Sequence, residues 1–179
     1  VGGTIDTSGD EAGGTGGTIK AIGLNTEVTG SLKATGDQAG GLIETSGKVL
    51  NIDDNAQIDA SSTNGKAGEW LLDPLMVVIS NHNSTSNASN GTWAYSGNGT
   101  ENTMSYVQAG KINDLLNTGT SVKIQATDTN AVASIEVDAA ITKTKGKEAS
   151  LTLEAQRNVT VNEEITSKSG KLNVNLHSD

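Results

Sequence analysis

Short apolar runs recur along this 179-residue chain at a nearly constant spacing, and this repeat constrains the fold more than any other feature. The runs that begin at Ile5, Leu32 and Ile58 start 27 and 26 residues apart. The runs alternate apolar with polar side chains and are rich in Val, Ile and Thr, which is the period-two pattern of β-strands. A fixed period of this size is the signature of a stacked repeat fold.

The same pattern continues through the rest of the sequence with different residues. Each period contains three short runs, separated by turn-forming stretches rich in Gly, Asn and Asp. The positions that we align are Ile19, Ile43 and Leu71 in the first half, and Val122 with Leu151, Ile135 with Val159, and Leu151 with Leu172 in the second.

Equivalent strands that stack in register close a coil of three strands per turn. The sequence therefore predicts an all-β fold, a parallel β-helix, which we expect to be right-handed because parallel crossovers almost always are. The composition agrees, since aromatic residues make up only 2% of the chain. A narrow core built from columns of Val, Ile, Leu and Ala has little room for repeated aromatic rings.

One stretch, residues 80–119, interrupts the repeat and divides the chain into coils at 1–79, a polar insertion, and coils at 120–179. Within the insertion, Ile112, Leu115 and Leu116 have helical spacing and Gly119 follows as a stop signal, which predicts a short helix over about 109–117. We expect this helix to pack on the outside of the solenoid, with its apolar side chains covering it. We expect Trp70 to cover the junction between coil and insertion.

Charge and composition exclude several classes of function. The net charge of -9 argues against a nucleic-acid binder and against docking on anionic lipid, both of which need basic clusters. The longest apolar run, residues 75–79, is too short to span a bilayer, so we expect no membrane insertion. With no cysteine, disulfides and thiolate metal sites are excluded. The first residue, Val1, suggests a mature product or an excised fragment.

Several stretches resemble the large two-partner-secreted exoproteins of Gram-negative bacteria, the adhesins of the filamentous-haemagglutinin and high-molecular-weight types. They are residues 40–48, 65–74, 112–126 and 159–174, so the resemblance covers most of the chain beyond Gly40. Its most specific part is the Trp-Leu-Leu-Asp-Pro sequence at 70–74.

The resemblance implies a right-handed parallel β-helix, secreted and displayed at the bacterial cell surface as the non-catalytic shaft of an adhesin. Its implied partners are a host-cell surface receptor or glycan and an outer-membrane transporter. The family's secretion domains carry Asn-Pro motifs, whereas the single proline here, Pro74, follows Asp73. We therefore expect a region outside this sequence to engage the transporter. The stalk of a contact-dependent-inhibition toxin or of a haemolysin is an alternative.

An enzyme of the carbohydrate-active β-helix type is the rival from another class. Such sites use clustered acids with Arg or His. The candidates here are the adjacent pair Asp53 and Asp54, the single arginine Arg157, and His82 and His177, which lie far apart in sequence. We therefore predict no catalytic residue. A calcium loop at 51–55 also fails, because Ala56 replaces the required glycine, so we predict no metal or cofactor.

Two further groups of residues are candidate sites. The N-x-S/T spacing occurs five times, mostly in the insertion, and the resemblance implies glycosylation there. Aromatic residues are enriched at interfaces, so the aromatics of the insertion could contact a receptor, although we favour packing on the solenoid. The candidates are Asn83, Asn87, Asn90, Asn98 and Asn158 for glycosylation, and Trp93, Tyr95 and Tyr106 for binding.

Overall fold

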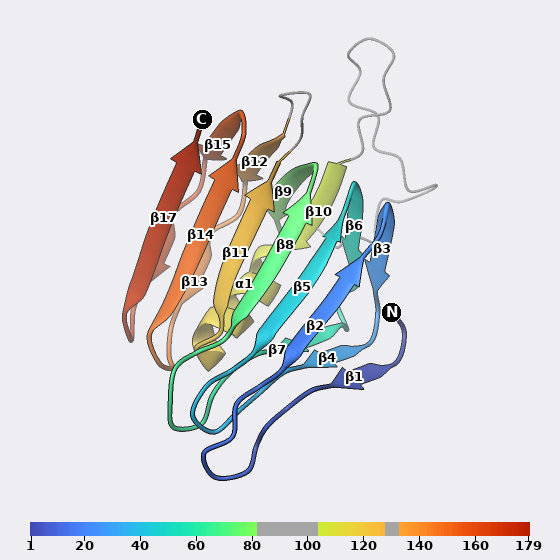
Figure 1. Ribbon diagram of the computed structural model, residues 1–179. Helices are drawn as coiled ribbons and strands as arrows, with labels where there is room; N and C mark the ends of the chain where they lie inside the picture. The colour runs from blue at the N-terminus through green and yellow to red at the C-terminus, as the bar shows by residue number, and fades with distance from the viewer. Residues whose placement is uncertain (82–103, 128–132) are drawn as a thin grey trace.

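The computed structural model describes residues 1–81, 104–127 and 133–179, which form a right-handed coil of parallel strands (Figure 1). The strands build three faces along one axis, and every strand pair in the described part of the chain is parallel. The predicted all-β parallel solenoid is therefore confirmed.

Two six-stranded sheets run the length of the solenoid. Sheet I contains, in spatial order, β2 (Thr18–Ile22), β5 (Leu42–Gly47), β8 (Glu69–Pro74), β11 (Ser121–Ala126), β14 (Ala149–Ala155) and β17 (Leu172–Ser178). Sheet II contains β3 (Asn25–Val28), β6 (Val49–Ile52), β10 (Met104–Gln108), β9 (Met76–Ser80), β12 (Ser134–Val137) and β15 (Asn158–Val161). In each strand, alternate side chains point into the core because the side-chain period of a strand is two.

The third face is interrupted. It begins with a three-stranded sheet and ends with a two-stranded one, and a ten-residue helix, α1 (Ala109–Thr118), lies between them (Figure 1). The strands are β1 (Thr4–Asp6), β4 (Ser31–Lys33) and β7 (Gln57–Asp59) on one side, and β13 (Ile141–Lys143) and β16 (Ile165–Ser167) on the other.

Much of the predicted register is confirmed. Leu32 pairs with Ile5 on one side and Ile58 on the other, Val122 pairs with Leu151, and Ile135 pairs with Val159. Most of these inward positions are fully buried, and the buried side chains form one continuous apolar cluster. Stability is thus distributed along columns in which each coil covers the next.

Two aligned positions were wrong. Ile43 pairs with Trp70, not with Leu71, and Leu151 pairs with Val174, not with Leu172. Trp70 is therefore an interior residue, completely buried, whose Nε1 donates a hydrogen bond to Thr45 Oγ1 at 3.0 Å. It does not cover the junction with the insertion. The sequence alignment paired Leu71 with Ile43 because both are aliphatic. The core instead accommodates the larger indole ring of Trp70, whose N–H donates to the inward hydroxyl of Thr45.

The stretch 80–119 is less separate than predicted. Strand β10 joins sheet II between β6 and β9, so Tyr106 belongs to a strand of the solenoid and not to a loop. The helix was predicted over 109–117 and spans Ala109–Thr118, but it replaces a strand of the third face instead of packing outside it. Its residues Ile112, Leu115 and Leu116 are part of the interior, so the expectation that they cover solenoid side chains is confirmed.

Candidate functional site

Helix α1 sits where a strand of the third face would otherwise lie, and this is the most irregular part of the described solenoid. The chain enters it from β10 and leaves it through Gly119, whose φ of 91° is favourable only for glycine. A helix satisfies its own backbone hydrogen bonds, so it cannot offer a ladder to the strands on either side. Those neighbouring edges need other partners, because buried backbone groups without partners are costly.

On the β7 side, a lysine of the helix supplies the missing donor. Lys111 Nζ donates to the backbone carbonyl of Asp54 at 2.9 Å and also to that of Ala56, both in the turn between β6 and β7. Farther along the same side of the break, Lys147 Nζ donates to the carbonyl of Ser62 at 3.0 Å. Ammonium groups thus take the place of backbone N–H groups on turns that precede the interruption.

On the β13 side, two asparagines of the helix supply acceptors. Asn113 Oδ1 accepts a hydrogen bond from the backbone N–H of Thr142 at 2.8 Å. Asn117 Oδ1 accepts from the N–H groups of Thr144 at 2.8 Å and Lys145 at 3.1 Å. The helix therefore presents a side-chain donor to one edge and side-chain acceptors to the other, whereas a strand in the same place would offer both N–H and C=O groups to each edge.

A buried lysine completes this region. The side chain of Lys143 is fully buried, and its Nζ donates to the carbonyls of Gly146 at 3.3 Å and Ser169 at 3.1 Å, and to that of Lys145. Burial lowers the pKa of Lys143. These carbonyls belong to the turns of two successive coils, so the ammonium group of Lys143 links the two coils. Sequence analysis missed this residue, although its place at an inward position of an alternating run was a signal.

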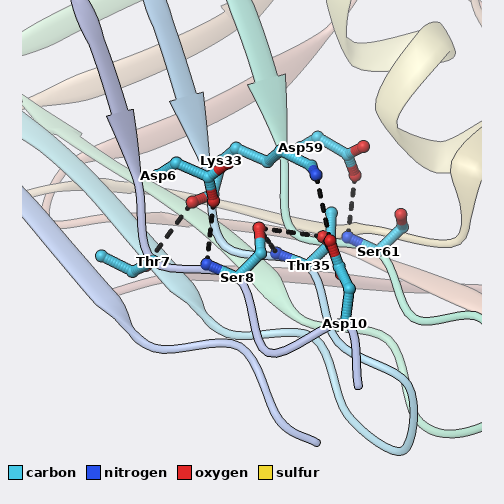
Figure 2. Close-up of polar contacts among 8 residues, drawn as sticks. All are labelled: Asp6, Thr7, Ser8, Asp10, Lys33, Thr35, Asp59 and Ser61. Atoms are coloured by element: carbon cyan, nitrogen blue, oxygen red, sulfur yellow. Dashed lines mark hydrogen bonds and ion pairs between the residues drawn. The ribbon is translucent and has the colours of Figure 1, made fainter. Parts of the chain in front are cut away.

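The N-terminal coils carry a different polar cluster, on the turns that follow β1, β4 and β7 (Figure 2). Asp6 and Asp59 each accept a hydrogen bond from the backbone N–H two residues later, at 2.9 Å, which closes equivalent turns in separate coils. Between them, Asp10 accepts from Thr35 Oγ1 at 2.6 Å and forms an ion pair with Lys33 at 3.2 Å. The hydrogen bonds from Thr35 and Lys33 lower the pKa of Asp10. This cluster ties turns together.

The candidate catalytic residues lie on separate coils. Asp53 and Asp54 occupy the turn after β6, where Asp53 Oδ1 accepts from the backbone N–H of Asn55 at 2.8 Å. Arg157 precedes β15, and His177 lies near the end of β17, 3.8 Å from Asp179. The Asp53 carboxylate therefore closes a turn here. Among the described residues, no group of three or more His, Asp or Glu side chains could hold a metal ion.

Two of the predicted modification and binding residues can be placed. Asn158 is exposed at the start of β15. Tyr106 is half-buried in β10, and burial together with the charge of Glu136 raises its pKa. The remaining candidates lie outside the described residues; they are Asn83, Asn87, Asn90, Asn98, Trp93, Tyr95 and His82.

A polar groove of about 650 Å³ crosses the starts of the sheet I strands. Ser121, Ser150 and Asn175 line it on the C-terminal side, and Lys66 and Glu69 bring charges of both signs. The outward side chains of this sheet pair with one another, as Lys20 does with Glu44 at 2.8 Å and Lys123 with Glu154 at 2.9 Å. The flank is therefore a polar surface on which acidic side chains outnumber basic ones, because Glu69 and Asp73 also lie at outward positions.

No protein-family model matches the chain, and no curated protein matches it significantly. In the described part of the chain, no helix is long and apolar enough to cross a membrane. The fold itself defines the class: this is a β-solenoid repeat protein with one helix inserted into its third face.

Proposed function

We propose that this chain is a segment of the shaft of a secreted bacterial surface adhesin. The observation that carries the proposal is the unbroken stacking of equivalent residues along sheets I and II, each six strands long. A stack of this kind grows by addition of further coils without any change in its cross-section. Its function is to hold a binding region at a distance from the cell.

Two other features support the proposal. Polar and acidic side chains cover the outer flanks, which keeps an elongated solenoid soluble and discourages lateral association. The sequence at 70–74 and the stretches around it resemble two-partner-secreted adhesins, whose shafts are parallel β-helices. In this proposal the partners are a host-cell receptor or glycan bound elsewhere and an outer-membrane transporter, and the protein lies at the bacterial surface.

The test removes one coil from the protein on the bacterial surface. Residues 18–41 form one period, because Thr18 pairs with Leu42. Their deletion joins Gly17 to Leu42, which then takes the place of Thr18 in the stack. We expect a protein that remains displayed and adhesive, with attachment that declines in steps as whole coils are removed. Deletion of residues 18–35 is the matched control and should abolish display, since it shifts the register.

Purified chain 1–179 provides the second arm of the test. A shaft segment should not compete with whole bacteria for attachment to host cells. Competition by this chain would contradict the proposal and place a receptor site within it. Absence of the protein from the cell surface, measured with an antibody against these coils, would also overturn it.

A further inference from the structure

The corner turn between β7 and β8 contains an Asn-Gly dipeptide, Asn64 and Gly65, and asparagine is one of the chemically labile residues of proteins. A glycine after the asparagine leaves the next backbone nitrogen unshielded, because glycine has no Cβ. Asn64 is exposed, so water reaches its side chain. The glycine cannot be exchanged, since a Cβ at Gly65 would lie 1.6 Å from the carbonyl oxygen of Gln38. The close stacking of the turns therefore requires the glycine that makes Asn64 reactive.

In the folded chain, one residue of the preceding coil holds both reacting groups. The backbone carbonyl of Asp37 accepts hydrogen bonds from the N–H groups of Asn64 at 2.8 Å and of Gly65 at 3.1 Å. The Asp37 carboxylate accepts a third hydrogen bond, from Asn64 Nδ2. The same carboxylate accepts from the N–H of Gly13 at 2.7 Å, so Asp37 joins the turns of three successive coils. The nucleophile, the Gly65 nitrogen, and the electrophile, the Asn64 Cγ, are thus both restrained.

We propose that Asn64 is a latent deamidation site, which stacking on the Asp37 turn keeps unmodified. When the two turns separate, the Gly65 nitrogen attacks Asn64 Cγ and forms the new C–N bond of a cyclic succinimide. The bond between Cγ and Nδ2 breaks, and the side-chain NH₂ group leaves as ammonia together with the proton from the Gly65 nitrogen. Water then opens the ring and leaves either aspartate or isoaspartate at position 64.

Neither product fits the stacked turn. A carboxylate at position 64 has no N–H group to donate, and it meets the Asp37 carboxylate with a like charge. Isoaspartate adds one carbon to the main chain, which displaces the next bond of the stack, from the Lys66 N–H to the Gln38 carbonyl at 2.9 Å. Each deamidation is therefore a one-way record that the two coils have separated. This inference does not depend on the adhesin function.

Peptide mapping by mass spectrometry tests the site in the purified chain under mildly alkaline conditions. We expect Asn64 to deamidate at least ~10-fold more slowly in the folded chain than in urea, because the reaction requires local opening of the stack. In urea, Asn64 should react as fast as Asn90 and Asn98, which are also followed by glycine. Asp37→Ala should raise the rate in the folded chain by ~10-fold, since the charge-assisted bond to Asn64 Nδ2 is lost.

Asp10→Ala is the matched control, because Asp10 also binds within a corner, to Thr35 and Lys33, and should leave the rate at Asn64 unchanged. Asp37→Asn retains an acceptor oxygen and should give an intermediate rate; it serves if circular dichroism shows that Asp37→Ala does not fold. Asn64→Asp should unfold at a lower urea concentration than the unmodified chain. A folded rate equal to that in urea, a rate that loss of the Asp37 carboxylate leaves unchanged or lowers, or an Asn64→Asp variant of full stability would each overturn the proposal.

Discussion

The N-terminal coils and the coils around α1 differ in how they satisfy the backbone hydrogen bonds between successive turns. Between residues 9 and 66 the turns lie directly on one another, with bridges from Gly9 to Gly36 and from Thr15 to Ala39. Backbone N–H groups meet backbone carbonyls there, as between Gly16 and Ala39 at 2.8 Å. Around α1 the ladder of the third face is interrupted, and lysine and asparagine side chains take over its hydrogen bonds.

This difference shows what continuity in a solenoid requires. Each strand edge needs hydrogen-bond donors opposite its carbonyls and acceptors opposite its N–H groups. The backbone of a neighbouring strand is one way to supply them. An ammonium group can replace a row of N–H donors, and an amide oxygen can replace a carbonyl. Glycine gives the closest backbone approach, whereas long polar side chains bridge a wider gap. The helix is accommodated for this reason, although it has no ladder of its own.

The largest expected effect comes from the interior column that the two regions share. Trp70→Ala should lower the free energy of unfolding by about 3–5 kcal/mol, because it leaves a cavity between Ile43 and Val122 and an inward hydroxyl without its partner. Leu71→Ala is the matched control, since Leu71 points outward. Urea unfolding of both variants measures the difference, and equal losses would contradict the register.

Two glycine-to-alanine variants should affect the stability of the N-terminal coils and of the helix region in opposite directions. A Cβ at Gly40 would lie 1.8 Å from the carbonyl oxygen of Ala60, so Gly40→Ala should cost about 3 kcal/mol or more. A Cβ at Gly110 meets nothing within 4 Å, and Gly110→Ala should stabilise the helix by about 1 kcal/mol. Thermal unfolding should shift in opposite directions. A loss at both positions would mean that α1 packs as tightly as the corners do.

The asparagine acceptors allow a finer test of the helix region. Asn113→Ala removes the acceptor for the Thr142 N–H and should cost about 1 kcal/mol. Asn113→Asp retains an acceptor oxygen and should keep most of the stability. Hydrogen exchange of the Thr142 amide is the specific readout, with faster exchange in the Ala variant alone. Equal exchange in both would show that this hydrogen bond does not replace the ladder.

The smallest effects concern pH, and in both regions stability should rise with pH, in the acid range for one group and in the alkaline range for the other. The hydrogen bond from the Gly13 N–H, and then that from Asn64, lower the pKa of Asp37. The contribution of the Asp37 carboxylate to the free energy of unfolding is therefore complete above the usual pKa of 3.8, and it is lost as the pH falls through the folded-state pKa. Burial lowers the pKa of Lys143, so the folded protein releases this proton at a lower pH than the unfolded chain does. Stability should therefore rise with pH between the folded-state pKa and the usual value of 10.5.

Urea unfolding across both pH ranges checks these signs. Asp37→Asn should flatten only the acid side of the profile, and Lys143→Met only the alkaline side. A profile that either substitution leaves unchanged would show that the corresponding group does not link pH to folding.

The sequence by itself determined the solenoid, its parallel stacking and the residue range of the helix. These follow from local features, namely the period-two runs, their recurrence and the 3.6-residue spacing of Ile112, Leu115 and Leu116. Within the solenoid it also predicted that Ile5, Leu32 and Ile58 share a column. The placement of Asp53 and Asp54 in a turn likewise follows from their neighbours in the chain.

Only the tertiary structure decided the register at Trp70 and Val174, the entry of β10 into sheet II, and the bonds made by Lys111, Asn113 and Lys143. A shift of one residue along a strand changes which face a side chain occupies, and short runs of similar residues align almost equally well at several offsets. The partners of the three polar side chains lie 2 to 57 residues away. Apart from the bonds that Lys143 makes within its own turn, they meet only because the coils bring separate turns to the same height.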